Sequence, residues 1–359
     1  MARIELAGIA HSYKPNPTQP SDYALRPMEM TWQDGGAYAL LGPSGCGKTT
    51  LLNIISGLIT PSQGKVLFDG HDVTQLPPEK RNIAQVFQFP VIYDTMTVAQ
   101  NLAFPLKNRK VQASEIKARV GRIAEMLEMS HQLDMRAAGL SADQKQKISL
   151  GRGLVRSDVS AILFDEPLTV IDPHLKWQLR RKLKQIHHEL KLTLIYVTHD
   201  QVEALTFANE VVVMSRGKAV QVGPAEALFE RPAHTFVGHF IGSPGMNFLP
   251  ARIETGKLLV LNQVLEVPAG RTLPVGPITL GIRPEYLSLS TEGCAGSLAA
   301  QVLRVQDIGT CQMVTCQMDV YILKVRLSPA SAVPQPGDTV HLQVLGEHTC
   351  FYQNEVLVS

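Results

Sequence analysis

The sequence predicts an α/β domain with a helical insert, followed by a smaller all-β domain. Over the first two-thirds of the chain, short apolar runs alternate with helical segments, which is typical of an α/β fold. Residues 97–156 hold helical patterns without a strand, and the last third consists of short alternating segments. The length of 359 residues exceeds the usual size of one domain, so two domains are expected.

The α/β domain is predicted from strands and helices that follow one another. Arg3–Ile9 alternates apolar and polar residues and indicates a strand. Helical spacing runs from Lys48 through Leu58 and again over Pro173–Leu190, where apolar residues recur every three or four positions. The buried-strand candidates are Ala37–Leu41, Ala84–Phe87, Ala161–Asp165, Thr193–Thr198 and Glu210–Met214. This order implies a largely parallel sheet covered by helices.

The helical insert and the all-β domain interrupt this alternation. Ser114–Met129 and Ser141–Val155 have helical patterns with no strand candidate between them, so a helical subdomain is expected at about 93–158. The pattern changes again near Gly242, and from Arg252 onward short segments such as Val340–Val344 are divided by Gly and Pro turns. We therefore expect an α/β domain over residues 1–235 and a β domain over residues 236–359.

Composition and charge give no support to several classes of function. Lys and Arg total 34 against 32 for Asp and Glu, and a net charge of +2 gives no reason to expect a nucleic-acid partner. No apolar run approaches the roughly 20 residues that cross a bilayer, and the start lacks the apolar stretch of a signal peptide. The five cysteines are scattered without a CxxC pair, so neither disulfides nor a zinc site is expected.

The strongest motif is a glycine-rich loop that follows a short apolar strand and precedes a helix. It has the pattern of a glycine, four residues, a glycine, a lysine and a threonine, which is typical of phosphate binding. Glycines let backbone N–H groups turn onto phosphate oxygens, and the helix N-terminus adds a positive partial charge. Lys48 supplies a full charge to the outer phosphates, and the Thr49 hydroxyl can ligate Mg²⁺. The loop consists of Gly42, Pro43, Ser44, Gly45, Cys46, Gly47, Lys48 and Thr49, followed by Thr50.

The second motif is an acidic pair at the end of the predicted strand Ala161–Asp165. Asp165 emerges at the carboxyl end of that strand, where open α/β sheets bind ligands, and can hold magnesium through its water shell. Glu166 follows where it could act as a general base on a water that attacks the γ-phosphorus. An acidic pair alone is often structural, but downstream of a phosphate loop it indicates a catalytic site.

These motifs resemble the nucleotide-binding subunit of ABC transporters, and over almost the whole chain the match is close to the maltose-importer ATPase family. The resemblance implies a P-loop NTPase fold with a helical insert and a C-terminal OB-like (TOBE-type) regulatory domain. Phe236–Pro244 with Met246–Leu249 resembles the junction into that domain, and Gly281–Glu285 is similar to one of its recurrent motifs. A generic β-barrel appended for stability is the alternative.

The same resemblance implies roles for four more residues. Gln88, in Val86–Pro90, contacts magnesium and the attacking water, and the residues after it face the transmembrane partner. Asp172 occupies the D-loop position, and His199 matches the switch histidine that reaches the γ-phosphate. Tyr13 stands where an aromatic ring stacks on adenine. Without the adjoining motifs, a lone His or Tyr would be read as a packing residue.

The signature loop departs from the family's pattern. In the family, two subunits pair head to tail, and each Leu-Ser-Gly-Gly-Gln loop closes over the partner's ATP. Here the loop reads Leu140, Ser141, Ala142, Asp143 and Gln144. Ser141 can still cap the following helix and donate to a γ-phosphate. A carboxylate at Asp143, about 5 Å from a phosphate charge, is repelled by roughly 3 kcal/mol at an effective dielectric of about 20. Asp143 therefore either turns away, towards Lys145 or Lys147, or weakens the site, and we expect pairing with a different ATPase subunit.

The resemblance implies an ATP-hydrolysing subunit that powers an importer of a sugar or polyol, with ATP and Mg²⁺ as cofactors. The variant signature resembles that of glycerol importers with two ATPase subunits, so glycerol is the first hypothesis for the cargo. The expected partners are a second ABC ATPase subunit, transmembrane permease subunits and, indirectly, a substrate-binding protein, but no nucleic acid. The subunit is expected at the cytoplasmic face of the inner membrane, as a peripheral protein.

Three alternatives stay open at this point. A P-loop GTPase is disfavoured because the sequence has no Asn-Lys-x-Asp motif and because Glu166 directly follows Asp165. A non-transport ABC protein acting on ribosomes or DNA usually carries two cassettes in one chain. A degenerate nucleotide-binding subunit of a heterodimer, with little hydrolysis of its own, is opposed by Glu166 and His199 and favoured by the altered signature.

Overall fold

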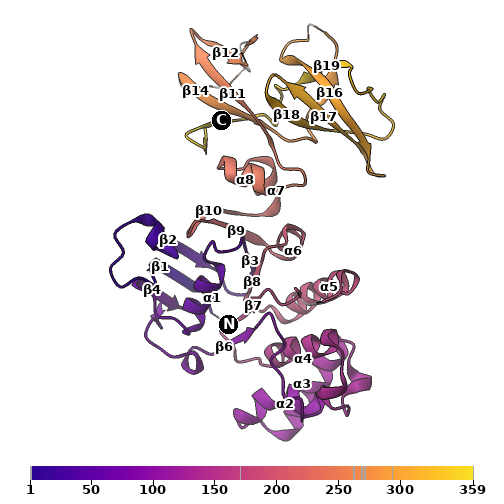
Figure 1. The fold of residues 1–359 in the computed structure, drawn as a ribbon. Coiled ribbons are helices and arrows are strands. Elements are labelled where there is room, and N and C mark those ends of the chain that lie inside the picture. Colours follow the sequence, from indigo (N-terminus) through magenta and orange to yellow (C-terminus); the bar gives the residue numbers. More distant parts are fainter. Residues whose placement is uncertain are drawn as a thin grey trace. The chain divides into compact units, whose positions relative to one another are not determined.

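The computed structural model describes residues 2–169, 171–261, 263–267, 270, 272–292 and 294–358. The chain forms two compact units, Met1–Ala225 and Glu226–Ser359 (Figure 1). Within the described ranges, none of the helices combines the length and the apolar character needed to cross a membrane.

The central sheet of the first unit confirms the predicted, largely parallel sheet. Its order is β10-β9-β3-β8-β7-β6, and every neighbouring pair is parallel except β9 and β10. The strands are β3 (Ala37–Leu41), β6 (Ile83–Val86), β7 (Ala161–Asp165), β8 (Leu194–Thr198), β9 (Glu210–Ser215) and β10 (Lys218–Gly223). In β7, Ile162 and Phe164 enter one core and Ala161 and Leu163 enter another. Burial on both faces explains why the strand is a continuous apolar run.

A second, antiparallel sheet has the order β2-β1-β4-β5. Its strands are β1 (Ile4–His11), β2 (Leu25–Trp32), β4 (Gln63–Phe68) and β5 (His71–Asp72). The helix α1 (Lys48–Ser56) shares one core with both sheets, because Leu51 and Ile55 pack with Ile4 of β1 and Leu40 of β3. This packing holds the start of α1, and the loop before it, at the carboxyl end of β3.

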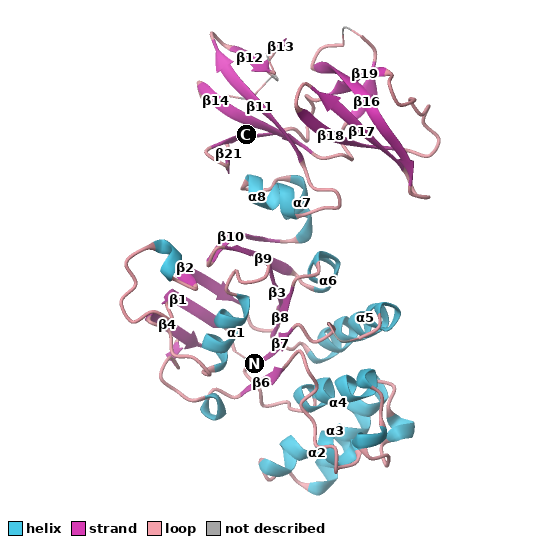
Figure 2. Ribbon diagram, viewed as in Figure 1, coloured by secondary structure: helices cyan, strands magenta, loops and turns pink. Residues whose placement is uncertain are grey.

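The helical insert lies between β6 and β7 in the sequence (Figure 2). It contains α2 (Val98–Asn108), α3 (Ala113–Met126) and α4 (Ala142–Leu154) and is followed by α5 (Pro173–Leu190) and α6 (Gln201–Phe207). Single turns of 3₁₀ helix occur at Pro20–Asp22, Pro78–Lys80, Ser130–Gln132 and Ala137–Gly139. Ile123 of α3 and Ile148 of α4 join the core that also holds Leu183 of α5. The insert therefore packs on the same face of the central sheet as α5.

The second unit contains two antiparallel sheets, which confirms the predicted all-β character of the C-terminal third. One sheet has the order β13-β12-β11-β14-β20-β21, and the other has the order β15-β19-β16-β17-β18. The first is built from β11 (Asn247–Glu254), β12 (Lys257–Val260), β13 (Gln263–Leu265), β14 (Gly276–Ile282), β20 (Cys350–Gln353) and β21 (Val356–Leu357). The second is built from β15 (Ser288–Ser290), β16 (Ser297–Asp307), β17 (Gln312–Met318), β18 (Tyr321–Leu327) and β19 (Thr339–Gln343). Leu249, Leu298 and Val314 share one core across the two sheets.

The division falls after Ala225 and not after residue 235, where the sequence pattern suggested it. The reason is that the short helices α7 (Ala225–Glu230) and α8 (Thr235–Phe240) are tied to the β unit. The buried guanidinium of Arg283 donates hydrogen bonds to the carbonyls of Phe229 and Ile241. The same guanidinium lies 3.9 Å from the centre of the Phe229 ring, so a single side chain fixes both helices.

Candidate functional site

The glycine-rich loop joins β3 to α1 in a conformation that needs glycine. Gly47 has a φ of +103°, in the left-handed region, and a Cβ there would lie 2.6 Å from the Ala24 carbonyl oxygen. At Gly42 a Cβ would lie 2.3 Å from the Met214 carbonyl oxygen. Both positions exclude a side chain, so the loop packs tightly against β9 at Gly42 and against the start of β2 at Gly47.

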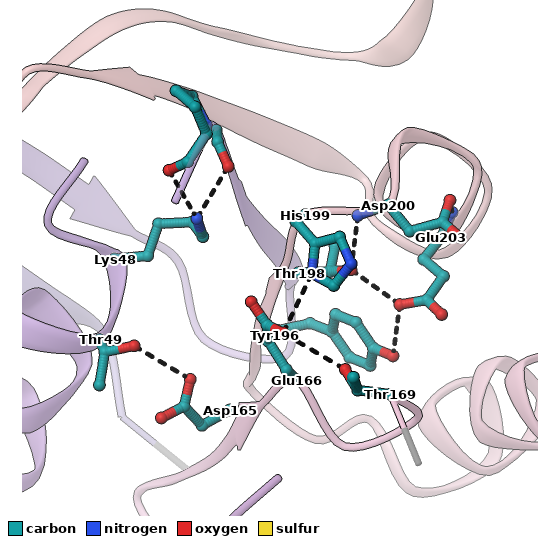
Figure 3. Close-up of polar contacts among 12 residues, drawn as sticks. Lys48, Thr49, Asp165, Glu166, Thr169, Tyr196, Thr198, His199, Asp200 and Glu203 are labelled. Atoms are coloured by element: carbon teal, nitrogen blue, oxygen red, sulfur yellow. Dashed lines mark hydrogen bonds and ion pairs between the residues drawn. The ribbon is translucent and has the colours of Figure 1, made fainter. Parts of the chain in front are cut away.

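Lys48, the first residue of α1, is buried and folded back over the loop. Its Nζ donates hydrogen bonds to the carbonyl oxygens of Gly42 at 2.8 Å and Pro43 at 3.1 Å (Figure 3). Cys46 is also buried, and burial raises the pKa of its thiol. The cysteine is therefore a small neutral side chain beside the ammonium group of Lys48.

A cleft of about 420 Å³ opens at the loop. It is lined by Tyr13, Ala24, Ser44, Gly45, Gly47, Lys48, Thr49, Thr50 and Glu166. Tyr13 is two-thirds exposed, and its hydroxyl lies 3.1 Å from Thr50 Oγ1. Its ring touches His11 edge to face, with 4.6 Å between ring centres. An exposed aromatic face beside a phosphate-type loop can stack on a flat heterocycle.

Asp165 ends β7 opposite the start of α1. Its Oδ1 accepts a hydrogen bond from Thr49 Oγ1 at 3.4 Å. Burial, followed by the neighbouring Glu166 carboxylate, raises the pKa of Asp165, while Thr49 and Lys48 act in the opposite direction. The site thus holds a partly buried carboxylate and a hydroxyl side by side, at the carboxyl end of the sheet.

Glu166 has an unusual backbone and joins the cleft to His199. Its φ of +47° is in the left-handed region, which a residue with a side chain rarely adopts and which often marks a functional site. Its Oε2 accepts hydrogen bonds from His199 Nδ1 at 3.0 Å and from Thr169 Oγ1 at 3.3 Å (Figure 3). The carboxylate is therefore held between the turn after β7 and the turn after β8.

A buried acid that the sequence analysis missed supports the turn carrying His199. Glu203 of α6 is 4% exposed, and its Oε2 accepts hydrogen bonds from Tyr196 and Thr198. Thr198 Oγ1 in turn accepts a hydrogen bond from the backbone N–H of Asp200. No linear motif marks Glu203, because its partners come together only when β8 and α6 are folded.

The signature residues lie at the start of α4, and none of the described residues that line the 420 Å³ cleft comes from them. Ser141 caps the helix: its Oγ accepts from the Gln144 N–H, and Gln144 Oε1 accepts from the Ser141 N–H. Ala142 follows on the exposed surface. Asp143 lines a second cleft, of about 470 Å³, together with Lys147 and residues of α5. The ammonium of Lys145 pairs instead with Asp94 at 3.0 Å.

Asp165 and His199 do not line the 420 Å³ cleft but are hydrogen-bonded to residues that do, whereas Asp172 and Gln88 lie elsewhere. Asp172 caps α5, and its Oδ1 accepts a hydrogen bond from the His174 N–H at 2.9 Å. Gln88 follows β6 and is half-buried. The structure therefore gathers the phosphate loop, Tyr13, Asp165, Glu166 and His199 at one edge of the sheet.

A glycine-rich loop with its lysine after β3, and an acidic pair at the end of β7 in the same sheet, define the chain as a P-loop nucleotide-binding protein. Comparison with protein families gives a narrower result. Residues 25–169 match the ABC transporter family, residues 242–287 the MalK OB fold domain, and residues 280–351 the TOBE domain.

Comparison with individual sequences and solved structures agrees with these family matches. The chain is 38% identical over 360 residues to the sn-glycerol-3-phosphate import ATP-binding protein UgpC of Burkholderia thailandensis, covering 98% of each chain. It is 40% identical over 291 residues to the protein of that name from Vibrio vulnificus, covering 81% of this chain and 78% of the other. The solved structure of cbiO1 from Clostridium perfringens, part of the ABC transporter complex cbiONQ, aligns with a TM-score of 0.58 at 26% identity, covering 64% of this chain and 90% of the other.

A solved ATP-binding cassette of an ABC transporter, in its ADP conformation, aligns with a TM-score of 0.56 over 66% of this chain and 98% of the other. At 23% identity it supports the fold alone. The chain belongs to the ATP-binding proteins of ABC transporters, and it is an ATPase with an OB and TOBE unit at its C-terminal side.

Proposed function

We propose that this subunit hydrolyses ATP at the cleft formed by the phosphate loop and thereby powers import across a membrane. The observation that carries the proposal is the contact between Glu166 and His199 at the edge of the cleft that holds Lys48. In this proposal Glu166 takes a proton from the attacking water, and His199 orients that carboxylate and reaches the γ-phosphate. Lys48 exchanges its two loop carbonyls for phosphate oxygens. The presence of Glu166 and His199 also argues against the alternative of a subunit that binds ATP without hydrolysing it.

We propose Mg²⁺ as the metal that accompanies ATP. The adjacent oxygens of Thr49 and Asp165 fit it, because magnesium prefers oxygen ligands and is usually bound by one or two protein groups together with phosphates. A cation there would also offset the burial that raises the pKa of Asp165. Gln88, at the end of β6, would contact the metal and the attacking water.

The proposed permease partner has a surface to dock on. After β6, the alternate residues Phe87, Phe89, Val91 and Tyr93 are all large, apolar and at least 38% exposed. An exposed patch of this kind on one short segment is typical of a protein–protein contact. We propose that this segment receives a cytoplasmic helix of the permease, which would hold the subunit at the membrane as a peripheral protein.

We propose that two ATPase subunits act head to tail, each placing Ser141 over the partner's ATP. The expected preference for a heterodimer rests on repulsion between Asp143 and a phosphate. Because Asp143 shares its cleft with Lys147, one turn further along α4, this repulsion is reduced, and a homodimer becomes the simpler hypothesis. The oligomeric state of the Glu166→Gln variant with ATP distinguishes the two dimers.

We propose the cargo from the names of the relatives, because an ATPase subunit need not contact the transported molecule itself. Those relatives are named for sn-glycerol-3-phosphate, which is the phosphate ester of the polyol suggested by the signature loop. Uptake of labelled sn-glycerol-3-phosphate, compared with glycerol, in cells with and without the gene tests this assignment.

The hydrolysis itself is tested in the complex with the co-purified membrane subunits. Glu166→Gln should retain ATP binding and lose turnover by about 10²–10⁴-fold, which is the typical contribution of a general base. Lys48→Ala should lose nucleotide affinity as well. An unchanged rate for Glu166→Gln would exclude Glu166 as the base.

A further inference from the structure

Gln146, on α4, is a buried polar side chain that the proposed chemistry does not use. It is 0% exposed, and it lies five residues after Ser141, which caps the same helix. Its Nε2 donates hydrogen bonds to the carbonyl oxygens of Pro167 at 2.6 Å and Phe87 at 3.3 Å. One amide group therefore links α4 to two other segments, which are distant from it in the sequence.

The two carbonyl groups belong to the segments that carry the proposed chemistry. Pro167 directly follows Glu166, whose backbone is in the left-handed region and is costly to hold. The carbonyl of Phe87 belongs to the same peptide unit as the N–H of Gln88. Gln146 thus restrains the backbone immediately after Glu166 and the backbone immediately before Gln88.

The orientation of the Gln146 amide is set by these two acceptors. Turning the group over would place its oxygen against two carbonyl oxygens, so the NH₂ group must face them. In this orientation Oε1 is buried and has no hydrogen-bond partner among the described residues. The two donated bonds therefore come with an unsatisfied buried oxygen. An apolar residue of the same shape would fill the space without that cost, so the donated bonds are the reason for a glutamine here.

The same face of α4 holds more of the segment after β6. Ser149 and Arg152 follow Gln146 along α4 at intervals of three residues. Ser149 Oγ accepts a hydrogen bond from the Val91 N–H, and Arg152 donates to the Val91 carbonyl. The Arg152 guanidinium also lies 4.7 Å from the centre of the Tyr93 ring. One helix thus begins at the signature serine and contacts the proposed permease-docking segment at Phe87, Val91 and Tyr93. Among these contacts, only that of Gln146 also reaches the turn after Glu166.

We propose that Gln146 is a positioning residue for ATP hydrolysis. By donating to both carbonyls, Gln146 couples the position of the turn that carries Glu166 to the position of α4. Hydrolysis then depends on the positions of Ser141, at the start of α4, and of the permease-docking segment. The proposal rests on the proposed function, because it assigns Gln146 an effect on Glu166 as the base. Gln146 is not among the described residues that line the 420 Å³ cleft, so its replacement should leave nucleotide binding intact.

The test compares Gln146→Met with Leu150→Met in the complex with the co-purified membrane subunits. Methionine has a similar length and removes both donated bonds, while Leu150 is a fully buried neighbour on α4 within the apolar core. We expect Gln146→Met to lower kcat by about 10–100-fold, the range expected when a reacting group is displaced by up to 1 Å, with KM for ATP unchanged within about threefold. Leu150→Met should keep both values, and both variants should unfold at similar temperatures.

A second comparison separates positioning from general damage. In the Glu166→Gln background, Gln146→Met should cause no further loss of turnover, because the two changes act on one step. An additional loss of the full factor, a rise in KM in parallel with the loss of kcat, or a wild-type rate for Gln146→Met would each overturn the proposal. Full turnover by Glu166→Gln alone would instead refute the proposed function, whatever Gln146→Met does.

Discussion

Asp165 shows, at the scale of one residue, a conflict between stability and function. Burial raises the pKa of its carboxyl group, so the folded protein binds this proton more tightly than the unfolded chain. The contribution of Asp165 to stability therefore decreases as pH rises above the ordinary carboxyl pKa. We predict that Asp165→Asn raises the unfolding temperature of the nucleotide-free protein at pH 7 and abolishes ATP hydrolysis, as measured by thermal unfolding and phosphate release.

Asp72 provides the control of opposite sign. Hydrogen bonds from Thr74 lower the pKa of the exposed Asp72 carboxyl, so its stabilising contribution is present at neutral pH and is lost as pH falls. Asp72→Asn should therefore lower the unfolding temperature slightly and leave turnover unchanged. A lower unfolding temperature for Asp165→Asn would mean that the Thr49 contact outweighs the cost of burying the charge.

The residues of the site could be predicted from the sequence only where they form continuous motifs. Lys48 and Glu166 follow a buried strand and Asp165 ends one, each in a recognisable pattern, and the structure brings them to one edge of the sheet. Glu203 and Gln146 could not be found in this way. Each is a single polar residue on a helix, and its function depends on hydroxyl or carbonyl partners supplied by other elements.

At the scale of the element, Ser141 caps α4 and is also proposed to contact the partner's ATP. The hydroxyl caps the helix through a reciprocal pair with Gln144, and α2 begins with the same arrangement at Thr97 and Gln100. We predict that Ser141→Ala and Thr97→Ala each cost about 0.5–2 kcal/mol of unfolding free energy. Only Ser141→Ala should also reduce ATP turnover, because only that serine is proposed to meet the partner's ATP. Denaturant unfolding and turnover of the two variants measure the difference.

Equal losses of turnover in the two capping variants would show that a loosened insert, and not the signature contact, limits hydrolysis. Unchanged turnover in both would remove Ser141 from the proposed composite site. Thr97 is a suitable reference because it caps a helix of the same insert, with side-chain bonds of 2.9 and 3.2 Å against 2.9 and 3.3 Å for Ser141.

The elements that could be predicted well are those with one dominant physical signal. The strands β3 and β7 are fully apolar until their ends, and α5 combines an Asp-Pro start with a regular apolar stripe, so their bounds match the expected ones. The strand β2 contains a proline and has an irregular burial pattern, and α2 contains Pro105, so neither is visible as a period. The antiparallel sheet depends on pairing across distant segments, which local periodicity does not contain.

At the scale of the whole molecule, each of the two units buries its own apolar core. The first unit has a core on each face of the central sheet, and every buried member of these cores precedes residue 225. The second unit encloses a separate core between its two sheets, with members from Leu249 to Phe351. A unit with its own core can fold alone, so cutting the chain between β10 and α7 should leave two folded pieces.

We predict that residues 1–224 unfold in one cooperative transition and bind ATP within about threefold of the intact chain, a difference below 1 kcal/mol. Residues 225–359 should fold as a β protein and bind no nucleotide, because every residue that lines the 420 Å³ cleft lies in the first unit. Thermal unfolding and a fluorescent ATP analogue provide the measurements. If the first piece folds and binds ATP but turns over at a different rate in the complex, the β unit regulates hydrolysis; if it fails to fold, the two units are energetically one.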